Sequence, residues 1–397
     1  MVGWSDERCS HGTPARAVTT VLVAPNAFKG SLTAVEAAAA MSAAAHVVMP
    51  AATVVVRPIA DGGDGSVDAL LTAGYDRLDV HVRPPHGSRG LAPIALRDDQ
   101  AVVELANSCG LLLTASDARD AMGSSTLGLG DAMLGAMAAG AHRIVLCVGG
   151  SASTDGGVGL LTALGARVVD VNGRDVAPGG RWLAEIASID VGGMDPRLHQ
   201  VDLIVATDVD SPLFGSTGAA HVFAPQKGAT PEEVALLDAG LRSWARVVAQ
   251  HTGRDETEVP GAGAAGGTAF AAISLLGASV VSGAQFIAEA IGLDQALAAS
   301  DLVITGEGSL DEQSLLGKGA VAVARSAREH GRPCVMVCGR IPLPEQDMAE
   351  LGVADFGALT DIASGESAIR DAAALLTRRT IEVLVARRQP HHPRNAQ

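Results

Sequence analysis

The chain has 397 residues, which on the usual size of domains is enough for two, and 48% of them are hydrophobic, so both cores can be filled. The formal net charge of −15 argues against nucleic acid or an anionic membrane as partner, because both require clustered Lys and Arg, and it favours a small-molecule ligand. Only 3% of the residues are aromatic, and a core of small aliphatic side chains suits helices packed on a sheet, which predicts an α/β fold.

The first twenty residues are polar and lack the apolar segment of a secretory signal, so we expect a cytoplasmic protein with disordered ends at 1–19 and 386–397. The uncharged stretch 260–288 is interrupted by small and polar residues, which argues against a membrane helix. An odd number of scattered cysteines in mostly apolar runs predicts reduced thiols. They are Cys9, Cys109, Cys147, Cys334 and Cys338.

The first predicted elements alternate between strand and helix. Apolar runs at 21–25 and 53–59 flank an Ala-rich helix expected at about 32–45, which is the βαβ pattern of a parallel sheet. The following segment, 76–106, has three strand-like runs separated by turn residues. It therefore predicts an antiparallel meander.

The central part of the chain continues with further helices and strands. The expected elements are helices at 126–139, 159–164 and 231–250 and strands at 143–148 and 201–207. The helix at 231–250 has Pro231 in its first turn and two glutamates beside its N-terminal dipole, both of which favour a helix start there.

Alternation of strand and helix returns near the C-terminus, in the style of the first elements. Strands are expected at 301–308, 333–339 and 356–362, with a helix at 320–330. We therefore predict a discontinuous parallel-sheet domain, 20–75 plus 262–385, with a second α/β domain, 76–261, inserted into it. A cleft between the two would collect the loops at the carboxyl ends of strands, where ligands of open α/β sheets bind.

The segment GGSASTDGG, residues 149–157, lies between a buried strand and an apolar helix. Missing side chains at such a junction let a ligand touch the backbone, and a helix N-terminus offers N–H groups to an anion, which predicts a phosphate cradle. The alternative is a tight turn that needs glycine for its backbone angles.

Known phosphate motifs do not cover this loop. The pattern G-x-x-x-x-G-K-[ST] is absent from the sequence. A G-x-G-x-x-G occurs at 261–266, but the polar segment RDETEVP precedes it where a dinucleotide-binding site needs a strand. A Rossmann oxidoreductase is therefore disfavoured.

Lysine usage points to anion binding. Lys29, Lys227 and Lys318 are the only lysines among 29 Lys and Arg residues, and each precedes a glycine. A compact ammonium group beside an open backbone suits a phosphate, although three surface lysines without a role are the alternative.

Carboxylates also gather in Gly-rich segments, several of them directly after a predicted strand. They are Asp61, Asp64, Asp155, Asp208, Asp210, Glu307 and Asp311. Hard oxygen ligands of this kind suit Mg²⁺, which proteins usually hold with one or two carboxylates and the phosphates of the substrate. One aspartate is alternatively a base toward a substrate hydroxyl, and Asp before Gly is also ordinary turn chemistry.

Six ordered segments together resemble the motif series of the bacterial glycerate kinase family that includes the glycerate 2-kinases. They are APNAFKGSLTA, PIADGGDGS, VGGSASTDGGVGLLTALGA, TDVDSPLFGSTGAAHVFAPQKGAT, PGAGAAGGTAFA and DLVITGEGSLDEQSLLGKG. The resemblance extends from about residue 21 to 385. It implies transfer of the ATP γ-phosphoryl group to D-glycerate with Mg²⁺, giving 2-phosphoglycerate, on a two-domain α/β fold with a flavodoxin-like part.

Site roles follow as hypotheses. Asp208, Lys29, Asp155 and Lys227 are the catalytic candidates, and Asp208 and Asp210 are the metal-binding candidates. The candidates for binding ATP or glycerate are Ser31, Asp61, Gly62, Gly63, Gly149, Gly150, Ser151, Ser153, Glu307 and Lys318. A kinase of another small hydroxy acid, phosphorylation at the 3-hydroxyl of glycerate, and a non-catalytic sensor of phosphorylated metabolites are the alternatives.

Overall fold

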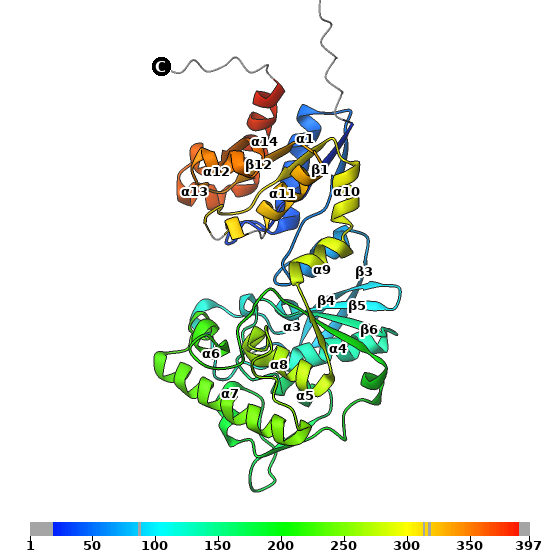
Figure 1. The fold of residues 1–397 in the computed structure, drawn as a ribbon, viewed down its shortest axis with the longest axis vertical. Coiled ribbons are helices and arrows are strands. Elements are labelled where there is room, and N and C mark those ends of the chain that lie inside the picture. Colours follow the sequence, from blue (N-terminus) through cyan, green and yellow to red (C-terminus); the bar gives the residue numbers. More distant parts are fainter. Residues whose placement is uncertain (1–18, 86–88, 313, 317–318, 389–397) are drawn as a thin grey trace, which may run out of the picture.

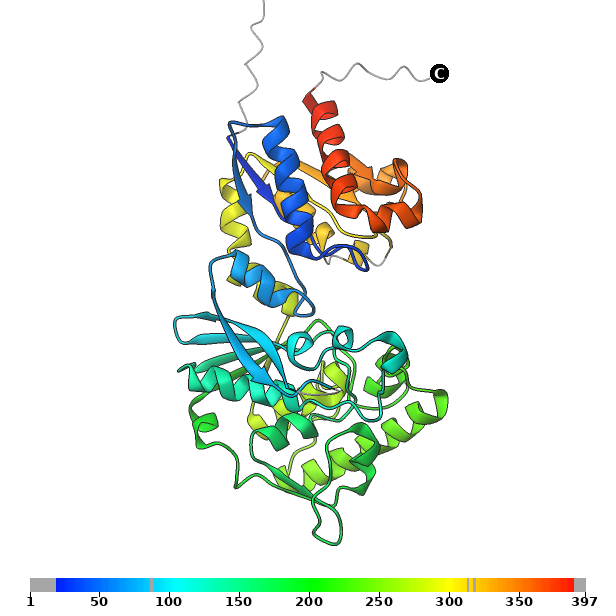
Figure 2. The ribbon, with the colours of Figure 1, turned by 180° about the vertical axis from the view of Figure 1, so that it is seen from behind.

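The computed structural model describes residues 19–85, 89–312, 314–316 and 319–388 (Figure 1). The expectations for residues 1–18 and 389–397, for Cys9 and for Lys318 lie outside this part of the chain. Figures 1 and 2 show two lobes, one built from both ends of the sequence and one from its middle. In the described part of the chain, no helix is long and apolar enough to cross a membrane.

The first lobe contains a sheet of five parallel strands in the order β13-β12-β11-β1-β2. The strands are β1 (Thr20–Val23), β2 (Thr53–Val56), β11 (Leu302–Thr305), β12 (Cys334–Cys338) and β13 (Val353–Ala358). Counted along the chain from the β2 edge, this order is 2-1-3-4-5, that of flavodoxin-like folds. The predicted flavodoxin-like sheet made from the two ends of the sequence is therefore confirmed.

Helices cover both faces of this sheet. They are α1 (Ala34–Val48), α10 (Leu293–Ala299), α11 (Ala320–Glu329), α12 (Glu345–Glu350), α13 (Gly365–Arg370) and α14 (Ala372–Arg388), with 3₁₀ turns η6 (Ser314–Leu316) and η7 (Leu359–Asp361). Val21 and Val23 of β1 are buried in one cluster with α1 and α14, whereas Leu22 is buried in another with α11. Because successive side chains of a strand alternate between faces, the continuous apolar run of β1 fills both layers.

The second lobe contains a six-stranded sheet in the order β10-β9-β6-β5-β4-β3. The strands are β3 (Asp76–Val82), β4 (Gly90–Arg97), β5 (Gln100–Glu104), β6 (Arg143–Cys147), β9 (Asp202–Ala206) and β10 (Ser279–Val281). Strands β3, β4 and β5 pair antiparallel, which confirms the predicted meander, and the other pairs are parallel.

Strand β10 belongs to this second sheet because it pairs with β9, whereas the sequence prediction assigns residues from 262 onward to the first domain. The division of the chain into domains itself stays a prediction.

Helices and a small two-stranded sheet complete the second lobe. The helices are α3 (Leu105–Cys109), α4 (Leu127–Ala138), α5 (Val158–Ala163), α6 (Ala219–Phe223), α7 (Pro231–Thr252) and α8 (Ala264–Leu276), and the small sheet pairs β7 (Arg167–Val169) with β8 (Ser188–Asp190). The 3₁₀ turns are η1 (Leu111–Leu113), η2 (Ser116–Ala118), η3 (Gly180–Glu185), η4 (Pro196–Gln200) and η5 (Pro225–Lys227). Helix α7 begins where predicted, because Thr230 and Glu233 form a reciprocal capping box and Pro231 occupies the first turn.

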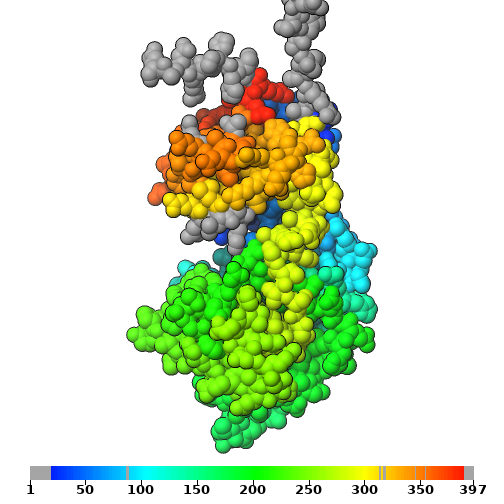
Figure 3. Space-filling view, in the orientation of Figure 1, coloured from blue at the N-terminus to red at the C-terminus, as the bar shows by residue number. Residues whose placement is uncertain are grey.

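Helices α2 (Ser66–Thr72) and α9 (Gly283–Ala290) lie between the two lobes, with α9 labelled in Figure 1 and α2 seen from behind in Figure 2. Leu70 of α2 and Ile287 of α9 share one buried cluster with Leu22 of the first sheet and Val145 of the second. Figure 3 shows that the molecule narrows at this level. The lobes are thus joined by a continuous apolar core rather than by loops alone.

Glu104, at the end of β5, is a further link between the second sheet and α2. Its carboxylate accepts hydrogen bonds from the backbone N–H groups of Gly65 (3.0 Å) and Val67 (2.8 Å). Burial raises the pKa of Glu104 to about 7. An anionic acceptor at the first turn of α2 satisfies N–H groups that the short helix leaves unpaired.

The cysteines of the described part of the chain are buried and free, as the sequence predicts. Cys109, Cys147, Cys334 and Cys338 form no disulfide among themselves. Burial raises the pKa of Cys109 and of Cys334 to about 12, so both remain unreactive thiols near neutral pH.

Candidate active site

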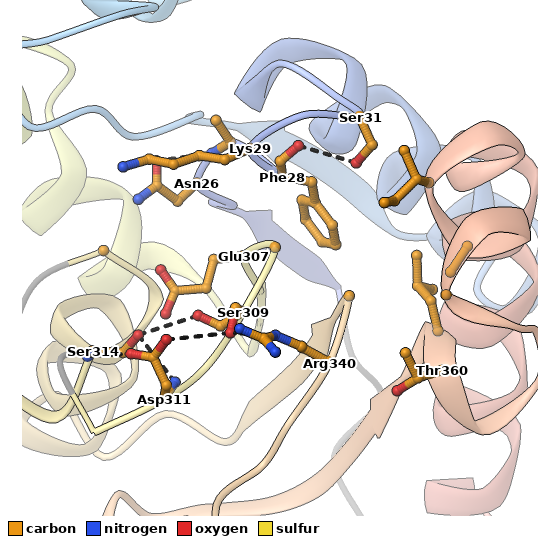
Figure 4. Close-up of a pocket in the computed structure, with 18 of the residues that line it drawn as sticks. Asn26, Phe28, Lys29, Ser31, Glu307, Ser309, Asp311, Ser314, Arg340 and Thr360 are labelled. Carbon is orange, nitrogen blue, oxygen red and sulfur yellow. Dashed lines mark hydrogen bonds between the residues drawn. The ribbon is translucent and has the colours of Figure 1, made fainter. Parts of the chain in front are cut away.

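A cavity of about 630 Å³ lies at the carboxyl ends of the strands of the first sheet (Figure 4). Every strand of that sheet contributes to its wall through the segment that follows it. The lining residues include Asn26 to Lys29 and Ser31 after β1, Asp61 after β2, Glu307 to Ser309, Asp311 and Ser314 after β11, Gly339 and Arg340 after β12, and Leu359, Thr360, Gly365, Ala368 and Ile369 after β13.

The strand order explains why the cavity forms here. From β1 the chain proceeds to β2 on one side, whereas β11 to β13 lie on the other side. The loops after β1 and β11 therefore diverge and leave a crevice, which is where open α/β sheets bind ligands. Lys29 lies on the first of these loops and Glu307 on the second.

Charged and polar side chains gather at one end of the cavity. Figure 4 shows Lys29 and Asn26 together on one side, with Glu307, Asp311 and Ser314 across from them. Arg340 donates from Nε to Ser309 Oγ at 2.9 Å, which fixes the loop after β12 against the loop after β11. Both signs of charge are present, as a ligand made of phosphates and a cation requires.

Glu307 is the most deeply placed carboxylate of the cavity. It is 9% exposed, and its Oε1 atom has no hydrogen-bond partner among the described residues. Burial raises the pKa of Glu307, whereas hydrogen bonds from Ser314 and from the N–H of Ala320, and to a smaller extent the positive charge of Lys29, oppose that rise. Glu307 lines the cavity, and a buried carboxylate oxygen without a protein partner indicates a group that a ligand or a cation satisfies.

The donor set of the cavity fits a magnesium ion bound together with phosphates. Among the described residues, no cluster of three or more His, Cys, Asp and Glu side chains is arranged to hold a metal ion by itself. Mg²⁺ in phosphoryl transfer typically takes only one or two carboxylates and completes its shell with phosphate oxygens and water. Glu307 and Asp61 are carboxylates of this cavity that suit such ligation.

The Gly-rich segment 149–157 of the second lobe is built differently. Asp155 is fully buried, and its carboxylate accepts four hydrogen bonds, from N–H and Oγ1 of Thr126 and from the N–H groups of Gly157 and Gly159. Gly157 is the N-cap residue of α5, and Gly159 lies in its first turn. The chain's own carboxylate thus occupies the place where the sequence analysis expects a phosphate.

Lys227 lies beneath the same segment. It is 2% exposed, and its Nζ donates to Ser151 Oγ at 2.7 Å and to the carbonyl oxygen of Ser153 at 2.5 Å. Burial lowers the pKa of Lys227 to about 7, and the charge of Asp155 acts against that decrease. The ammonium group therefore holds the loop from inside and does not point to solvent.

The glycines of 149–150 meet those of 62–63 where the lobes join. The N–H of Gly149 donates to the carbonyl oxygen of Gly62 at 3.1 Å. A Cβ atom on Gly149 would lie 2.4 Å from Cα of Gly63, so only glycine permits this approach. The segments of the second and third motifs in the sequence thus form one backbone junction.

The pattern G-x-G-x-x-G at 261–266 serves packing in the same region. Gly266 has a φ of +65°, and a Cβ atom there would lie 2.3 Å from the carbonyl oxygen of Ser153. The motif supports the loop at 149–157, in agreement with its rejection as a dinucleotide fingerprint.

Asp208 stands at the end of β9 and faces the start of α9. Its carboxylate accepts from Ser282 Oγ at 2.7 Å and from the N–H of Ala284 at 3.2 Å. Asp210 is exposed two residues further on. These contacts place Asp208 at the joint between the second sheet and the connecting helix.

The structure brings part of the predicted set together. Lys29, Ser31, Asp61 and Glu307 line the cavity of the first lobe, whereas Gly149, Gly150, Ser151, Ser153, Asp155 and Lys227 lie in the second lobe, with Gly62 and Gly63 at the junction. Lys318 lies outside the described residues. None of the predicted roles is tested by these positions.

Several lining residues are absent from the predicted set, and three of them bear on the further argument. Arg340, Thr360 and Ile369 stand in the cavity wall, in segments without a Gly-rich motif as long as the others. Arg340 and Ile369 follow predicted strands, whereas Thr360 lies within the strand predicted at 356–362 and follows β13 only because that strand ends at Ala358. All loops after parallel strands meet at the same edge of the sheet.

Comparisons with known proteins agree on one family. The model described as the glycerate kinase family matches residues 21–387. A glycerate kinase of Halalkalibacterium halodurans is 37% identical over 90% of this chain and 96% of its own length, and a glycerate 2-kinase of Escherichia coli is 37% identical over 89% and 93%. A crystal structure described as that of a candidate glycerate kinase 2 from Salmonella typhimurium LT2 aligns with a TM-score of 0.78 and 35% identity, covering 93% of this chain and 98% of that one.

Proposed function

The chain belongs to the glycerate kinase family, and from this premise we propose that it transfers the γ-phosphoryl group of ATP to D-glycerate, giving 2-phosphoglycerate. Phosphoryl transfer requires little covalent chemistry from a protein. It requires positioned reactants and neutralised phosphate charge.

The observation that supports this proposal most directly is the polar end of the first-lobe cavity. There an exposed lysine, Lys29, stands among Asp61, Glu307 and Asp311 at the crevice of a flavodoxin-like sheet. A point charge on a flexible stem is the usual partner of a transferring phosphate. We assign Lys29 to charge neutralisation at the γ-phosphate.

The carboxylates divide into two roles in this proposal. Glu307, with an oxygen that lacks a protein partner, would be the principal residue to hold Mg²⁺, and the ion would supply neutralisation of phosphate charge there. Asp61 is exposed at the junction of the lobes and accepts the proton of the glycerate hydroxyl. Lys227 and Asp155 act as positioning residues, because both are buried and bonded to the segment at 149–159.

Asp208 and Asp210 are kept as lesser candidates for the metal. The Asp208 carboxylate already accepts hydrogen bonds from Ser282 and Ala284, and these contacts support a role in fixing α9. A metal at Asp208 would have to compete with them.

Phosphorus NMR of the reaction products tests the proposal. The purified chain is incubated with ATP, Mg²⁺ and D-glycerate, and spectra are recorded without proton decoupling. A phosphate on C2 is split by one proton and one on C3 by two, so we expect a doublet for 2-phosphoglycerate. A triplet would assign the 3-hydroxyl instead.

Matched acceptors define the substrate. L-Glycerate, glycolate and lactate are run beside D-glycerate, and ADP release is measured for each. Faster turnover of another hydroxy acid would contradict D-glycerate as the substrate. Binding of ATP without ADP release with any acceptor would contradict catalysis.

A further inference from the structure

The first-lobe cavity has an apolar end as well as a polar one. Phe28, Leu359, Ala368 and Ile369 line it on the side of α13. In Figure 4 Phe28 and Thr360 lie toward this side, away from Lys29 and Asn26. The cavity therefore suits a ligand with one apolar, planar part and one anionic part.

The size of the cavity argues against glycerate as its only occupant. A volume of about 630 Å³ lies within the range of roughly 300–1,000 Å³ that holds drug-sized ligands. A three-carbon acid has only seven heavy atoms and would leave most of this space, including the apolar end, unused. A nucleotide has enough atoms to reach both ends.

Ile369 is the exposed member of the apolar end. Its side chain is 59% exposed, whereas Phe28, Leu359 and Ala368 beside the same cavity are buried. A flat ring placed in the cavity would cover Ile369 and complete an apolar wall that is otherwise already packed. The hydroxyl of Thr360, in the same wall, is a hydrogen-bonding group for the edge of a base or for a ribose.

The polar end is matched to the other half of such a ligand. Lys29 and Arg340 are exposed cations of the cavity wall, and Oε1 of Glu307 has no hydrogen-bond partner among the residues that the structure describes. These groups face phosphates and an accompanying cation in a nucleotide complex.

We propose that the first-lobe cavity is the nucleotide subsite, with the adenine ring against Ile369 and Phe28 and the triphosphate extending toward Lys29 and Glu307. D-Glycerate then meets the γ-phosphate from the side of the second lobe, near Asp61 and the glycine junction. This assignment rests on the proposed function for the identity of the two substrates.

Substitution of the exposed apolar residue tests the subsite. Ile369→Asp places a carboxylate where the ring would pack, so we expect the KM for ATP to rise about tenfold or more while the KM for D-glycerate stays within about twofold. Leu236→Asp is the matched control, because Leu236 is 61% exposed on α7 of the other lobe. Both KM values are expected to stay unchanged in that control.

A binding measurement separates failure of this assignment from failure of the proposed function. Calorimetric titration of the full chain with ADP and Mg²⁺ requires no turnover, and Ile369→Asp is expected to weaken ADP binding about tenfold, with Leu236→Asp as the reference. If Ile369→Asp weakens ADP binding while the original chain phosphorylates no acceptor, the result would support the nucleotide subsite and contradict the proposed kinase activity.

A different result would contradict the nucleotide subsite and leave the proposed kinase activity in place. A raised KM for D-glycerate with an unchanged KM for ATP, in a chain that still makes 2-phosphoglycerate, would overturn the subsite and leave the kinase intact. Equal melting temperatures of the variants and the original chain show that the differences are not caused by unfolding.

Discussion

The first-lobe cavity and the second-lobe segment at 149–157 carry the same sequence signal, an acidic residue in a Gly-rich loop after a buried strand, yet they are built in opposite ways. Glu307 keeps a carboxylate oxygen without a hydrogen-bond partner among the described residues, whereas Asp155 has both oxygens bonded by donors of its own chain. Lys29 is exposed at the first, and Lys227 is buried at the second. Such a motif thus marks either a ligand site or an internal anchor, and the position of the donors decides which.

The largest effect is expected from removal of the anchor. Asp155→Ala leaves four donors without their acceptor and leaves the Lys227 ammonium without a buried counter-charge, so the free energy of unfolding should fall by about 3–5 kcal/mol. Urea denaturation measures this change. Asp210→Ala, at an exposed aspartate, is the control and should stay within about 0.5 kcal/mol. Equal stability of both variants would show that Asp155 does not anchor this part of the second lobe.

Removal of the exposed cation should act on rate and not on folding. Lys29→Ala is expected to lower kcat by about 10²- to 10³-fold, because one charge-stabilising group in the transition state is lost. The melting temperature should stay the same, since the side chain is exposed. Steady-state kinetics with D-glycerate and ATP check this, and a normal kcat would exclude Lys29 from the mechanism.

The buried lysine should instead appear in the pH dependence of stability. Because the pKa of Lys227 is lowered from 10.5 to about 7 on folding, the unfolded chain retains a proton between these values that the folded chain has released. Stability therefore rises with pH across this window, by at most about 1.4 kcal/mol per pH unit, and this group adds no slope below pH 7. Lys227→Met should lack this part of the rise in denaturation curves from pH 7 to 10. An unchanged slope would show that Lys227 does not titrate in this way.

A small effect on stability is expected at the cavity carboxylate. Glu307→Gln keeps the shape and removes a buried charge whose pKa is already raised, so stability should change by less than about 0.5 kcal/mol or increase slightly. The Mg²⁺ concentration for half-maximal activity should rise about tenfold or more. Titration of activity with Mg²⁺ provides the readout. A loss of stability like that of Asp155→Ala would show that Glu307, like Asp155, anchors the fold from inside.

Local sequence predicts much of the fold because its causes are local. Helix α7 begins at Pro231 as expected, since the cap and the proline lie within four residues of one another. The meander from β3 to β5 is predicted equally well, because short strands separated only by turns have few alternative pairings. The sequence analysis predicts no strand at β10, because a run of three residues gains its partner β9 only in the folded chain.

Only part of the candidate site can be predicted from the sequence. Three predicted residues line the cavity: Lys29, which is one of three lysines that each precede a glycine, and Asp61 and Glu307, which are carboxylates in Gly-rich segments. Arg340 and Ile369 were missed, since nothing within their own segments shows that they face the loop after β1, more than 300 residues away in the chain.

The sequence by itself determined that this is an α/β protein of the glycerate kinase family and which segments carry its polar chemistry, because strand periodicity, caps and ordered motifs are properties of contiguous residues. Only the tertiary structure decided which carboxylates are free for a ligand. That choice depends on donors such as the N–H and hydroxyl groups of Thr126, which lies 29 residues from Asp155 and reaches it through the packing of separate elements.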